Sequence, residues 1–175
     1  MPNENGWSLI LHGGAKEIAP EEQRDHRDGV SGALTSGIEL LDRGGTAVEA
    51  VEAVVRALEA NPIFNAGIGA VKNRKGQVEL DASIMDGSSL DIGAVAGLQG
   101  FRHPVSIAQA MLREKQVLLV GEGAVEFAQK HRAERWDLGG KSKSKTNASD
   151  TVGCVARDRS GRLAVASSSG GLDGA

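Results

Sequence analysis

Thr151 is the residue whose position most suggests chemistry, because it stands where a polar segment meets an apolar run. Residues 139–150 carry no aliphatic side chain larger than alanine, and the chain then resumes as Thr-Val-Gly-Cys-Val-Ala. A hydroxyl group at such a junction suits a self-cleaving nucleophile, which attacks the preceding carbonyl group and afterwards carries a free α-amine. That amine, with a reference pKa of about 7.7–8.0, can act as the general base without a histidine. If this junction is considered alone, the more common explanation is that Thr151 is simply the first residue of a strand and not a nucleophile.

Two other patterns look like known sites but fail on their spacing. Residues 67–72 begin like a dinucleotide-binding glycine motif, but the sixth position is Lys72 and the segment opens a predicted strand, where the motif needs a helix. Asp81, Asp86 and Asp91 recur every five residues in a strand and turn region. Residues five apart on a strand face opposite sides, so these carboxylates are not expected to converge on one metal ion.

Composition and charge argue against several classes of partner. Lys and Arg number 20 against 23 Asp and Glu, which gives a net charge of −3, so no nucleic-acid partner is expected. No apolar run approaches the roughly 20 residues of a membrane helix, and the first residues do not read as a secretory signal. The 4 His and the single Cys154 lack the paired spacing of a zinc site. A cytoplasmic protein with no membrane partner is therefore expected.

The first part of the chain predicts a strand followed by two helices. A short apolar run at 7–11 ends at a glycine pair, which is typical of a buried strand that enters a tight turn. Apolar residues at spacings of three and four predict a helix over 21–42. Thr46, with Glu49 three residues later, forms the capping-box pattern, which predicts the start of a second helix whose apolar stripe reaches Leu58.

The rest of the chain alternates predicted strands and helices. Residues 70–72 and 78–84 are strand-like runs joined by a glycine-containing turn, so a hairpin is predicted there. The small residues at 92–98 suit a strand packed closely by helices on one side. Further predictions are a helix over 104–112, a strand at 117–120, a helix over 123–131, and a hairpin of 151–156 with 162–169.

Six short segments occur in a specific order. They are 12–15 (HGGA), 61–71 (NPIFNAGIGAV), 79–87 (ELDASIMDG), 93–97 (GAVAG), 150–153 (DTVG) and 167–171 (SSSGG). Together they resemble the plant-type asparaginase/isoaspartyl peptidase family of N-terminal nucleophile hydrolases, to which glycosylasparaginase also belongs. Each segment is modest alone, but their order and spacing are specific, and the resemblance runs from about His12 to Gly171.

The resemblance implies an α/β fold, an αββα four-layer sandwich, and a precursor that cuts itself between Asp150 and Thr151. Residues 1–150 would form the α-subunit region, with a flexible linker at 136–150, and residues 151–175 the start of the β-subunit region. Together they are expected to form one incomplete domain. Its C-terminal part, with the oxyanion donors and the residues that bind the substrate's α-carboxylate and α-amine, is expected outside this chain. The family also implies a dimer of αβ units.

The activity implied by the resemblance is hydrolysis by a threonine nucleophile. Thr151 would attack the side-chain carbonyl group of L-asparagine or of a β-aspartyl (isoaspartyl) peptide, form a β-aspartyl ester, and release ammonia or the peptide before water frees aspartate. Ser169 stands where the family usually has a second threonine that hydrogen-bonds the nucleophile. Asn65 matches an asparagine that positions the nucleophile, although a loop asparagine that satisfies backbone groups is the alternative. Gly13 and Gly14 match a glycine turn beside the active site.

The resemblance also implies a structural sodium ion and no cofactor for catalysis. The family's loop holds the ion through backbone carbonyl groups, and an oxygen-only site fits a hard cation. The matching residues in this chain are Leu58, Glu59, Asn61, Phe64, Ala66 and Ile68.

Two alternative functions stay open from the sequence. A glycosylasparaginase-like amidase would act on glycan-linked asparagine within the same fold, although no secretory signal is evident. A non-catalytic, truncated paralogue would instead act as a binding or assembly partner.

Overall fold

The computed structural model describes residues 6–136 and 150–171, which form one sheet of six strands and four α-helices. Most of the predicted linker, 137–149, and the last residues, 172–175, lie outside the described residues. The strands are β1 (Ser8–His12), β2 (Leu80–Asp86), β3 (Ile92–Leu98), β4 (Leu118–Val120), β5 (Thr151–Arg157) and β6 (Leu163–Ser169). The helices are α1 (Gln23–Asp42), α2 (Ala47–Glu59), α3 (Pro104–Met111) and α4 (Glu122–Lys130), with a 3₁₀ turn η1 (Gly67–Gly69).

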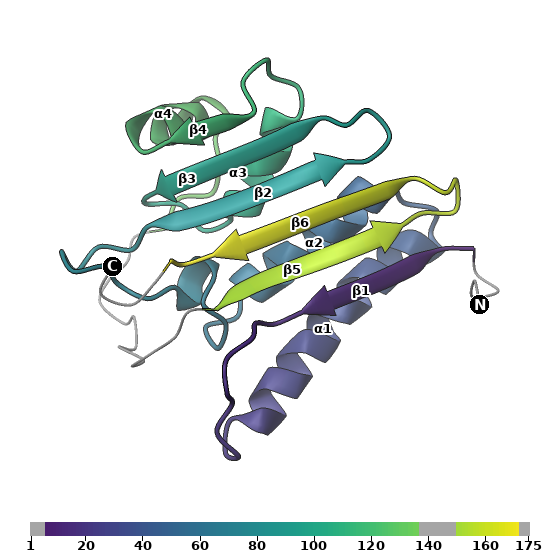
Figure 1. Cartoon of the computed structure of the whole chain (residues 1–175), viewed down its shortest axis with the longest axis horizontal. Coiled ribbons are helices and arrows are strands. Elements are labelled where there is room, and N and C mark those ends of the chain that lie inside the picture. Colours follow the sequence, from purple (N-terminus) through teal and green to yellow (C-terminus); the bar gives the residue numbers. More distant parts are fainter. Residues whose placement is uncertain (1–5, 137–149, 172–175) are drawn as a thin grey trace.

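The β5–β6 hairpin lies inside the sheet, between strands from the first part of the chain (Figure 1). The strand order is β1-β5-β6-β2-β3-β4, and all neighbours are antiparallel except β3 and β4. The first strand, β1, pairs with β5, and β2 pairs with β6. Thr151 is therefore the first residue of an internal strand.

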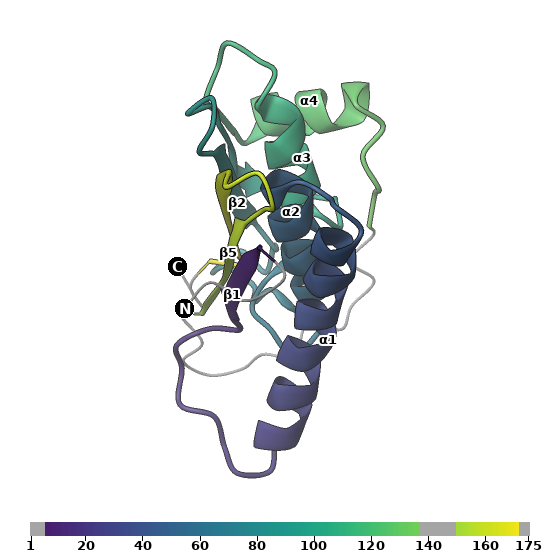
Figure 2. The same ribbon diagram turned by 90° about the vertical axis from the view of Figure 1, so that its right-hand side faces the viewer.

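The four helices of the described residues lie on one face of the sheet (Figure 2). Helix α1 packs on α2, α2 packs beneath β5 and β6, and α3 and α4 cover β3. The described residues thus form a mixed α/β architecture with one sheet and one helical layer of the expected sandwich. Among them, no helix combines the length and apolar character that crossing a membrane requires.

Helix α2 begins at the capping box that its sequence predicts. Glu49 N–H donates to Thr46 Oγ1 at 3.2 Å, and Thr46 N–H donates to Glu49 Oε2 at 2.8 Å. Hydrogen bonds from the backbone and side chain of Thr46 lower the pKa of the Glu49 carboxyl group. Asp158, buried in the β5–β6 turn, accepts a hydrogen bond from Ala47 N–H at 3.2 Å. The first turn of α2 is therefore attached to the hairpin that Thr151 begins.

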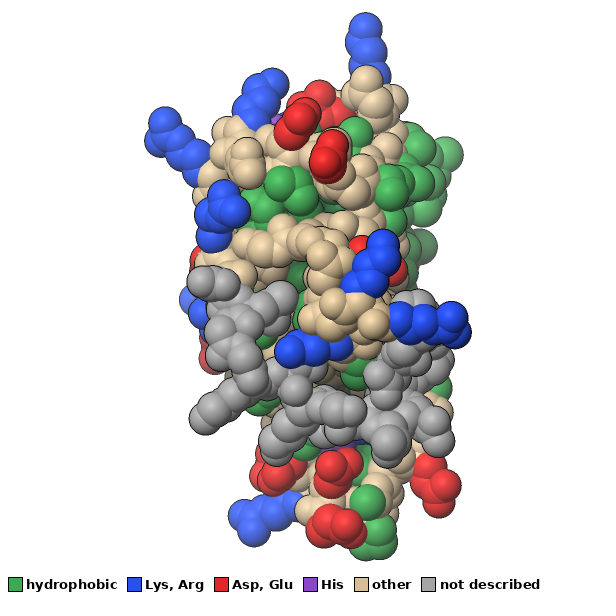
Figure 3. Space-filling model, turned by 90° about the vertical axis from the view of Figure 1, so that its left-hand side faces the viewer, with side chains coloured by type: hydrophobic (Ala, Val, Ile, Leu, Met, Phe, Trp, Pro, Cys, Tyr) green, Lys and Arg blue, Asp and Glu red, His purple; other side chains and the backbone are tan. Residues whose placement is uncertain are grey.

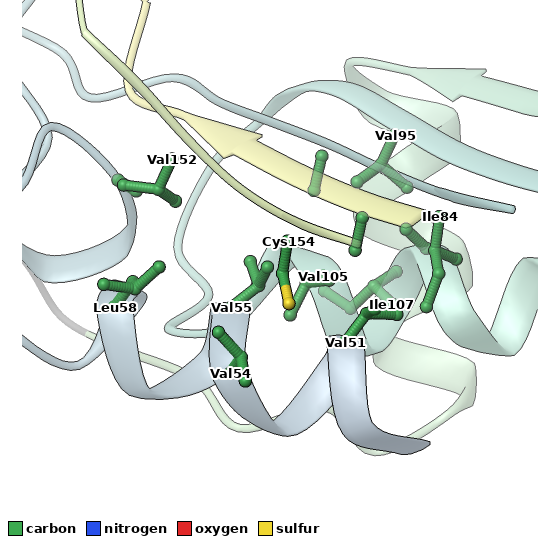
Figure 4. Packing of buried hydrophobic residues seen from close by; sticks show 14 of the residues in the cluster. Val51, Val54, Val55, Leu58, Ile84, Val95, Val105, Ile107, Val152 and Cys154 are labelled. Carbon is green, nitrogen blue, oxygen red and sulfur yellow. The ribbon is translucent and has the colours of Figure 1, made fainter. Parts of the chain in front are cut away.

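The apolar stripe of α2 packs beneath β5 and β6 (Figure 4). Its fully buried side chains are Val51, Val54, Val55 and Leu58. Each contributes about 1.5–3 kcal/mol by leaving water. Val152 and Cys154 of β5 are buried against this stripe. Because side chains alternate along a strand, Thr151 faces the opposite, uncovered side.

The uncovered face carries an apolar row across five strands. Cross-strand pairing joins Ile10 to Val155, Val155 to Val165, Val165 to Met85, and Met85 to Ile92. Apart from Met85, these side chains are 40–69% exposed. Contiguous apolar surface usually marks a packing or interaction site. The row is suited to face-to-face packing with a second sheet, as the expected sandwich requires.

The strand predicted at 70–72 is wrong. The turn that follows it does form, because Gly76 N–H donates to Asn73 O at 2.9 Å, but residues 70–72 adopt no strand. Val71 N–H donates instead to Asn65 Oδ1 at 3.0 Å. This side-chain contact occupies the Val71 N–H group, which is then not available to a strand ladder.

Gly93 in β3 provides a test of the close packing between the sheet and α3. A Cβ atom at Gly93 would overlap Ala108 O, so we expect Gly93→Ala to lower the free energy of unfolding by about 2 kcal/mol or more. Gly123 in α4 is the matched control, because nothing lies within 4 Å of a Cβ atom there. We expect Gly123→Ala to be neutral or to stabilise by up to about 1 kcal/mol. Urea unfolding followed by circular dichroism measures the free energy of unfolding of both variants. Equal values for the two variants would contradict the close packing of α3 on Gly93.

Candidate active site

Three polar residues share one row across the uncovered face. Thr151 at the start of β5 pairs with Ser169 at the end of β6, and Ser169 pairs with Asp81 in β2. Paired residues of antiparallel strands point to the same face, with Cα atoms about 4.5–5.5 Å apart. Thr151 and Asp81 are exposed, and Ser169 is half-buried. The structure thus brings the predicted nucleophile and its predicted hydroxyl partner to neighbouring positions.

The glycine turn after β1 closes on the residue that precedes Thr151. Asp150 is buried, and its Oδ1 accepts a hydrogen bond from Ala15 N–H. Gly14 has a φ of +122°, which L side chains rarely adopt, and a Cβ atom there would overlap the Asp150 carboxylate. Only glycine allows this approach. The turn therefore holds Asp150, and with it the Asp150–Thr151 peptide bond.

A cavity of about 490 Å³ lies beside Asp150. Gly13 forms part of its wall and packs on Phe64, because a Cβ atom at Gly13 would lie 2.6 Å from the ring. The remaining polar lining includes Lys16, Gln23, His26 and Arg27. Asp150 of the predicted cleavage site thus lines this cavity, whereas the predicted nucleophile Thr151 does not.

Asn65 holds the turn that follows Ser169. Its Nδ2 donates to Gly171 O at 2.8 Å, and its backbone O accepts from Gly170 N–H at 2.8 Å. Gly170 packs so closely here that a Cβ atom would overlap Asn65 Oδ1. These bonds match the reading of Asn65 as a loop residue that satisfies backbone groups. Its predicted contact with the hydroxyl or amine of Thr151 stays a prediction.

The neighbouring row on the uncovered face is also polar. His12 pairs with Gly153, Gly153 with Ser167, and Ser167 with Ser83, whose hydroxyl oxygen lies 3.3 Å from that of Ser167. A Cβ atom at Gly153 would lie 2.5 Å from His12 Nε2, so the imidazole ring lies over the glycine. The open face is thus divided into a polar end around Thr151 and the apolar row. Figure 3 views the molecule from the side on which β5 begins, where both basic and acidic side chains are exposed.

The residues predicted to hold a sodium ion lie at the end of α2 and in the loop that follows it. A Cβ atom at Gly67 would overlap Glu59 O, and one at Gly69 would overlap Phe64 O. The carbonyl oxygens of Glu59 and Phe64 therefore lie against this tight glycine loop, and oxygen atoms are the donors that a hard cation prefers. By contrast, no group of three or more His, Cys, Asp and Glu side chains in the described residues is arranged to hold a metal.

A larger cavity, about 650 Å³, lies at the opposite end of the sheet. It is bordered by the start of α2, the β2–β3 turn and the β5–β6 turn, and it is lined by charges of both signs. Neither Thr151 nor Ser169 borders it. Residue pairing, and not cavity size, therefore identifies the candidate active site.

Comparison with known proteins decides the family. A family model described as asparaginase matches residues 5–141, which is more than half of the chain. The chain belongs to this asparaginase family. The matched residues include the glycine turn, Asn65 and the carbonyl loop, whereas Thr151 lies beyond them.

Two of three individual relatives of this asparaginase-family chain extend the similarity past Thr151. The isoaspartyl peptidase of Salmonella typhimurium is 39% identical over 195 residues, which cover 94% of this chain and 62% of the relative. The isoaspartyl peptidase/L-asparaginase of Xenopus laevis is 38% identical over a match that covers 94% of this chain and 59% of the relative. The plant-type L-asparaginase of Thermococcus kodakarensis is 48% identical over a match that covers 74% of this chain and 43% of the relative. The chain thus spans about three fifths or less of the length of these relatives.

Asp81 belongs to the row of Thr151 and Ser169, although the spacing argument did not single it out. That argument considered it only with two later carboxylates, whereas the structure of this asparaginase-family chain places it in the row of Thr151 and Ser169. Its Oδ1 accepts a hydrogen bond from Gly97 N–H at 2.8 Å. The sequence contains one indication of Asp81, because this carboxylate lies in the segment 79–87, one of the six ordered segments. Recognising its place in the row requires the strand order, which spacing alone does not contain.

Cys154, three residues beyond Thr151, provides a test of how β5 is buried in this asparaginase-family chain. Burial raises the pKa of its thiol to about 12. We expect the native protein to react with a thiol reagent at pH 8 at least about a hundredfold more slowly than the urea-unfolded protein, because the thiolate is the reactive form. The folded state also keeps this proton to higher pH than the unfolded state, so the free energy of unfolding falls as pH rises above about 8.5. Equal reactivity of the native and unfolded protein would contradict this burial.

Proposed function

We propose that the protein is a self-cleaving threonine amidohydrolase that acts on L-asparagine, on β-aspartyl peptides, or on both. The observation that carries this proposal is the position of Thr151. Thr151 begins β5 on the open face and pairs with Ser169. It directly follows Asp150, whose side chain accepts a hydrogen bond from the glycine turn. The names of the relatives, isoaspartyl peptidase and plant-type L-asparaginase, support the same chemistry.

Self-cleavage would use the peptide bond between Asp150 and Thr151. The Thr151 hydroxyl oxygen attacks the carbonyl carbon of Asp150, the C–N bond breaks, and the hydroxyl proton passes to the Thr151 nitrogen. Water then hydrolyses the resulting ester, which leaves a C-terminal carboxylate on Asp150 and a free α-amine on Thr151. The glycine turn supports this step, because it holds Asp150 through its side chain and so positions the carbonyl group.

Turnover would use the freed α-amine as the base. The amine takes the hydroxyl proton while the Thr151 oxygen attacks the side-chain carbonyl carbon of the substrate. Ammonia, or the amine of the departing peptide, leaves with a proton, and a β-aspartyl ester remains. Water hydrolyses the ester, aspartate leaves, and the hydroxyl group is restored. Negative charge develops on the carbonyl oxygen in both steps and requires fixed donors.

Ser169 would hold the nucleophile in position. Its Oγ already accepts a hydrogen bond from Gly171 N–H at 3.2 Å, so its own hydrogen is available to donate. Ser169 pairs with Thr151 across the two strands, so we expect this hydrogen to reach the Thr151 hydroxyl oxygen. Asn65 supports the same arrangement through the turn at 170–171.

A bound sodium ion would supply structure and not a reaction step. Carbonyl groups of the loop at 58–68 would hold it, and it would fix the backbone that carries Asn65. We propose a dimer of αβ units as the assembly, on the basis of the family resemblance. The substrate is a small amide or β-aspartyl peptide, and no catalytic cofactor is required by this mechanism.

Replacement of Thr151 tests the proposal most directly. In the complete natural protein, mass spectrometry is expected to show a new N-terminus at Thr151. Thr151→Ala removes the attacking oxygen and is expected to abolish both this cleavage and the hydrolysis of L-asparagine and of a β-aspartyl dipeptide. Thr151→Ser keeps the hydroxyl and is expected to cleave. Thr35→Ala removes an exposed hydroxyl group in α1 and is the matched control, with unchanged cleavage.

The same experiment separates the alternatives. Cleavage at this bond by the Thr151→Ala variant would refute the self-cleaving mechanism. Preferred hydrolysis of glycan-linked asparagine would favour a glycosylasparaginase-like amidase. A complete protein that neither cleaves itself nor hydrolyses any of these substrates would favour the non-catalytic partner.

Gly14→Ala tests whether the glycine turn positions the cleavage site. The added methyl group would overlap the Asp150 carboxylate at a φ of +122°, so we expect the cleavage rate to fall at least about tenfold. Gly32→Ala in α1 is the control, because nothing lies within 4 Å of its Cβ position. Fragment formation on gels over time measures both rates. Equal rates would show that the turn does not position Asp150.

A further inference from the structure

Glu59 is a buried carboxyl group that the proposed reaction does not use. It is the last residue of α2 and is 0% exposed. Its Oε1 accepts a hydrogen bond from Val105 N–H at 3.0 Å, in the first turn of α3, and its Oε2 lies 3.2 Å from His103 Nδ1. Charged groups are almost never fully buried unless they are paired. The two contacts therefore tie the end of α2 to the start of α3.

A third contact of Glu59 comes from β6. Burial raises the pKa of Glu59, and the polar groups of His103, Ser168 and Val105 that face the carboxyl group oppose the rise. Ser168 is 1% exposed, and within the described residues its hydroxyl oxygen makes no hydrogen bond of ordinary geometry. Its interaction with the Glu59 carboxyl group is therefore a long or bent one. A serine in the sheet is nonetheless turned toward this carboxyl group.

Ser168 connects Glu59 to the row that contains Thr151. Side chains alternate along β6, so Ser168 faces the helices while Ser169 faces the open side with Thr151. One short backbone segment thus carries both the serine that meets Glu59 and the residue paired with the nucleophile. The Glu59 carboxyl group therefore approaches β6 one residue away from Ser169.

A second connection runs through the loop after α2. Because a Cβ atom at Gly67 would overlap Glu59 O, the loop lies directly on the last residue of the helix. The same loop carries Asn65, which bonds Gly170 and Gly171 immediately after Ser169. Glu59 is therefore linked to the end of β6 both through Ser168 and through this loop.

His103 holds the carboxyl group from the other side. Its ring is 7% exposed, and its Nε2 lies 3.7 Å from Glu134 Oε2. Arg102 donates to the same glutamate at 3.1 Å. His103 precedes α3 but makes no side-chain capping bond to it, so Glu59 supplies the acceptor for Val105 N–H. The imidazole thus lies between an exposed ion pair and the buried carboxyl group.

We propose that Glu59 is a positioning residue for the Thr151–Ser169 pair and that His103 holds its carboxyl group in the required orientation. This inference rests on the proposed threonine mechanism. Glu59 touches no reacting atom. It fixes the end of β6 and therefore the separation of the two hydroxyl groups. Because a misplacement of about 1 Å can lower a rate about a hundredfold, loss of the pair is expected to act on kcat.

Steady-state kinetics of the complete, cleaved protein test this inference. The substrate is whichever of L-asparagine and a β-aspartyl dipeptide the wild type hydrolyses, and kcat is expressed per free Thr151 N-terminus. Glu59→Gln and His103→Leu are expected to lower kcat at least about tenfold, with KM changed less than about threefold. His103→Asn keeps an N–H donor near the Nδ1 position and is expected to keep kcat within about threefold of wild type. Glu126→Gln removes an exposed carboxylate from α4 and is the matched control, with unchanged kcat.

Three outcomes separate positioning from packing. Wild-type kcat in both Glu59→Gln and His103→Leu would overturn the inference, and so would equal losses in His103→Leu and His103→Asn. If Glu59→Gln does not fold, the two His103 variants carry the comparison, with thermal melting to show whether the loss of kcat follows a loss of stability. An inactive wild type would instead refute the proposed function, before any variant is compared.

Discussion

The packing of β5 on α2 is the constraint on which the candidate site depends. Val152 and Cys154 are buried against the apolar stripe of the helix, and the alternation of the strand then directs Thr151 to the open face. A shift of one residue would bury the Thr151 hydroxyl group and expose Val152, which is unfavourable on both counts. The reactive residue is thus oriented by its apolar neighbours, and the same hairpin is attached to α2 through Asp158.

Close backbone approach is the second requirement, and glycine meets it beside Thr151 and beside Ser169. Gly14 lets the turn after β1 reach the carboxylate of Asp150, and Gly170 lets the end of β6 reach Asn65. Each contact joins segments that are far apart in the sequence. The site therefore depends on the assembled sheet, because neither the residues near Thr151 nor those near Asn65 contain the complete arrangement.

Local patterns predicted most of the fold, because they record interactions between residues close in sequence. The capping box of Thr46 and Glu49 forms as expected, and the helix and strand periodicities reproduce the main elements. The strand predicted at 70–72 does not form, and the side chain of Asn65, six residues earlier, accepts a hydrogen bond from Val71 N–H instead. Alternation within a strand shows which residues share a face, but it does not show which strand lies beside it.

The same distinction explains which site residues could be predicted. Thr151 stood out through its junction and Ser169 through the resemblance, whereas Asp81 joins them only through the order of the strands. Glu59 was expected to contribute a backbone carbonyl group, which a local loop motif can indicate. The partners of its side chain, His103 and Val105, lie just before α3 and in its first turn, so no local pattern contains them. A buried carboxyl group must find such partners, and this requirement connects a residue outside the row to the position of the nucleophile.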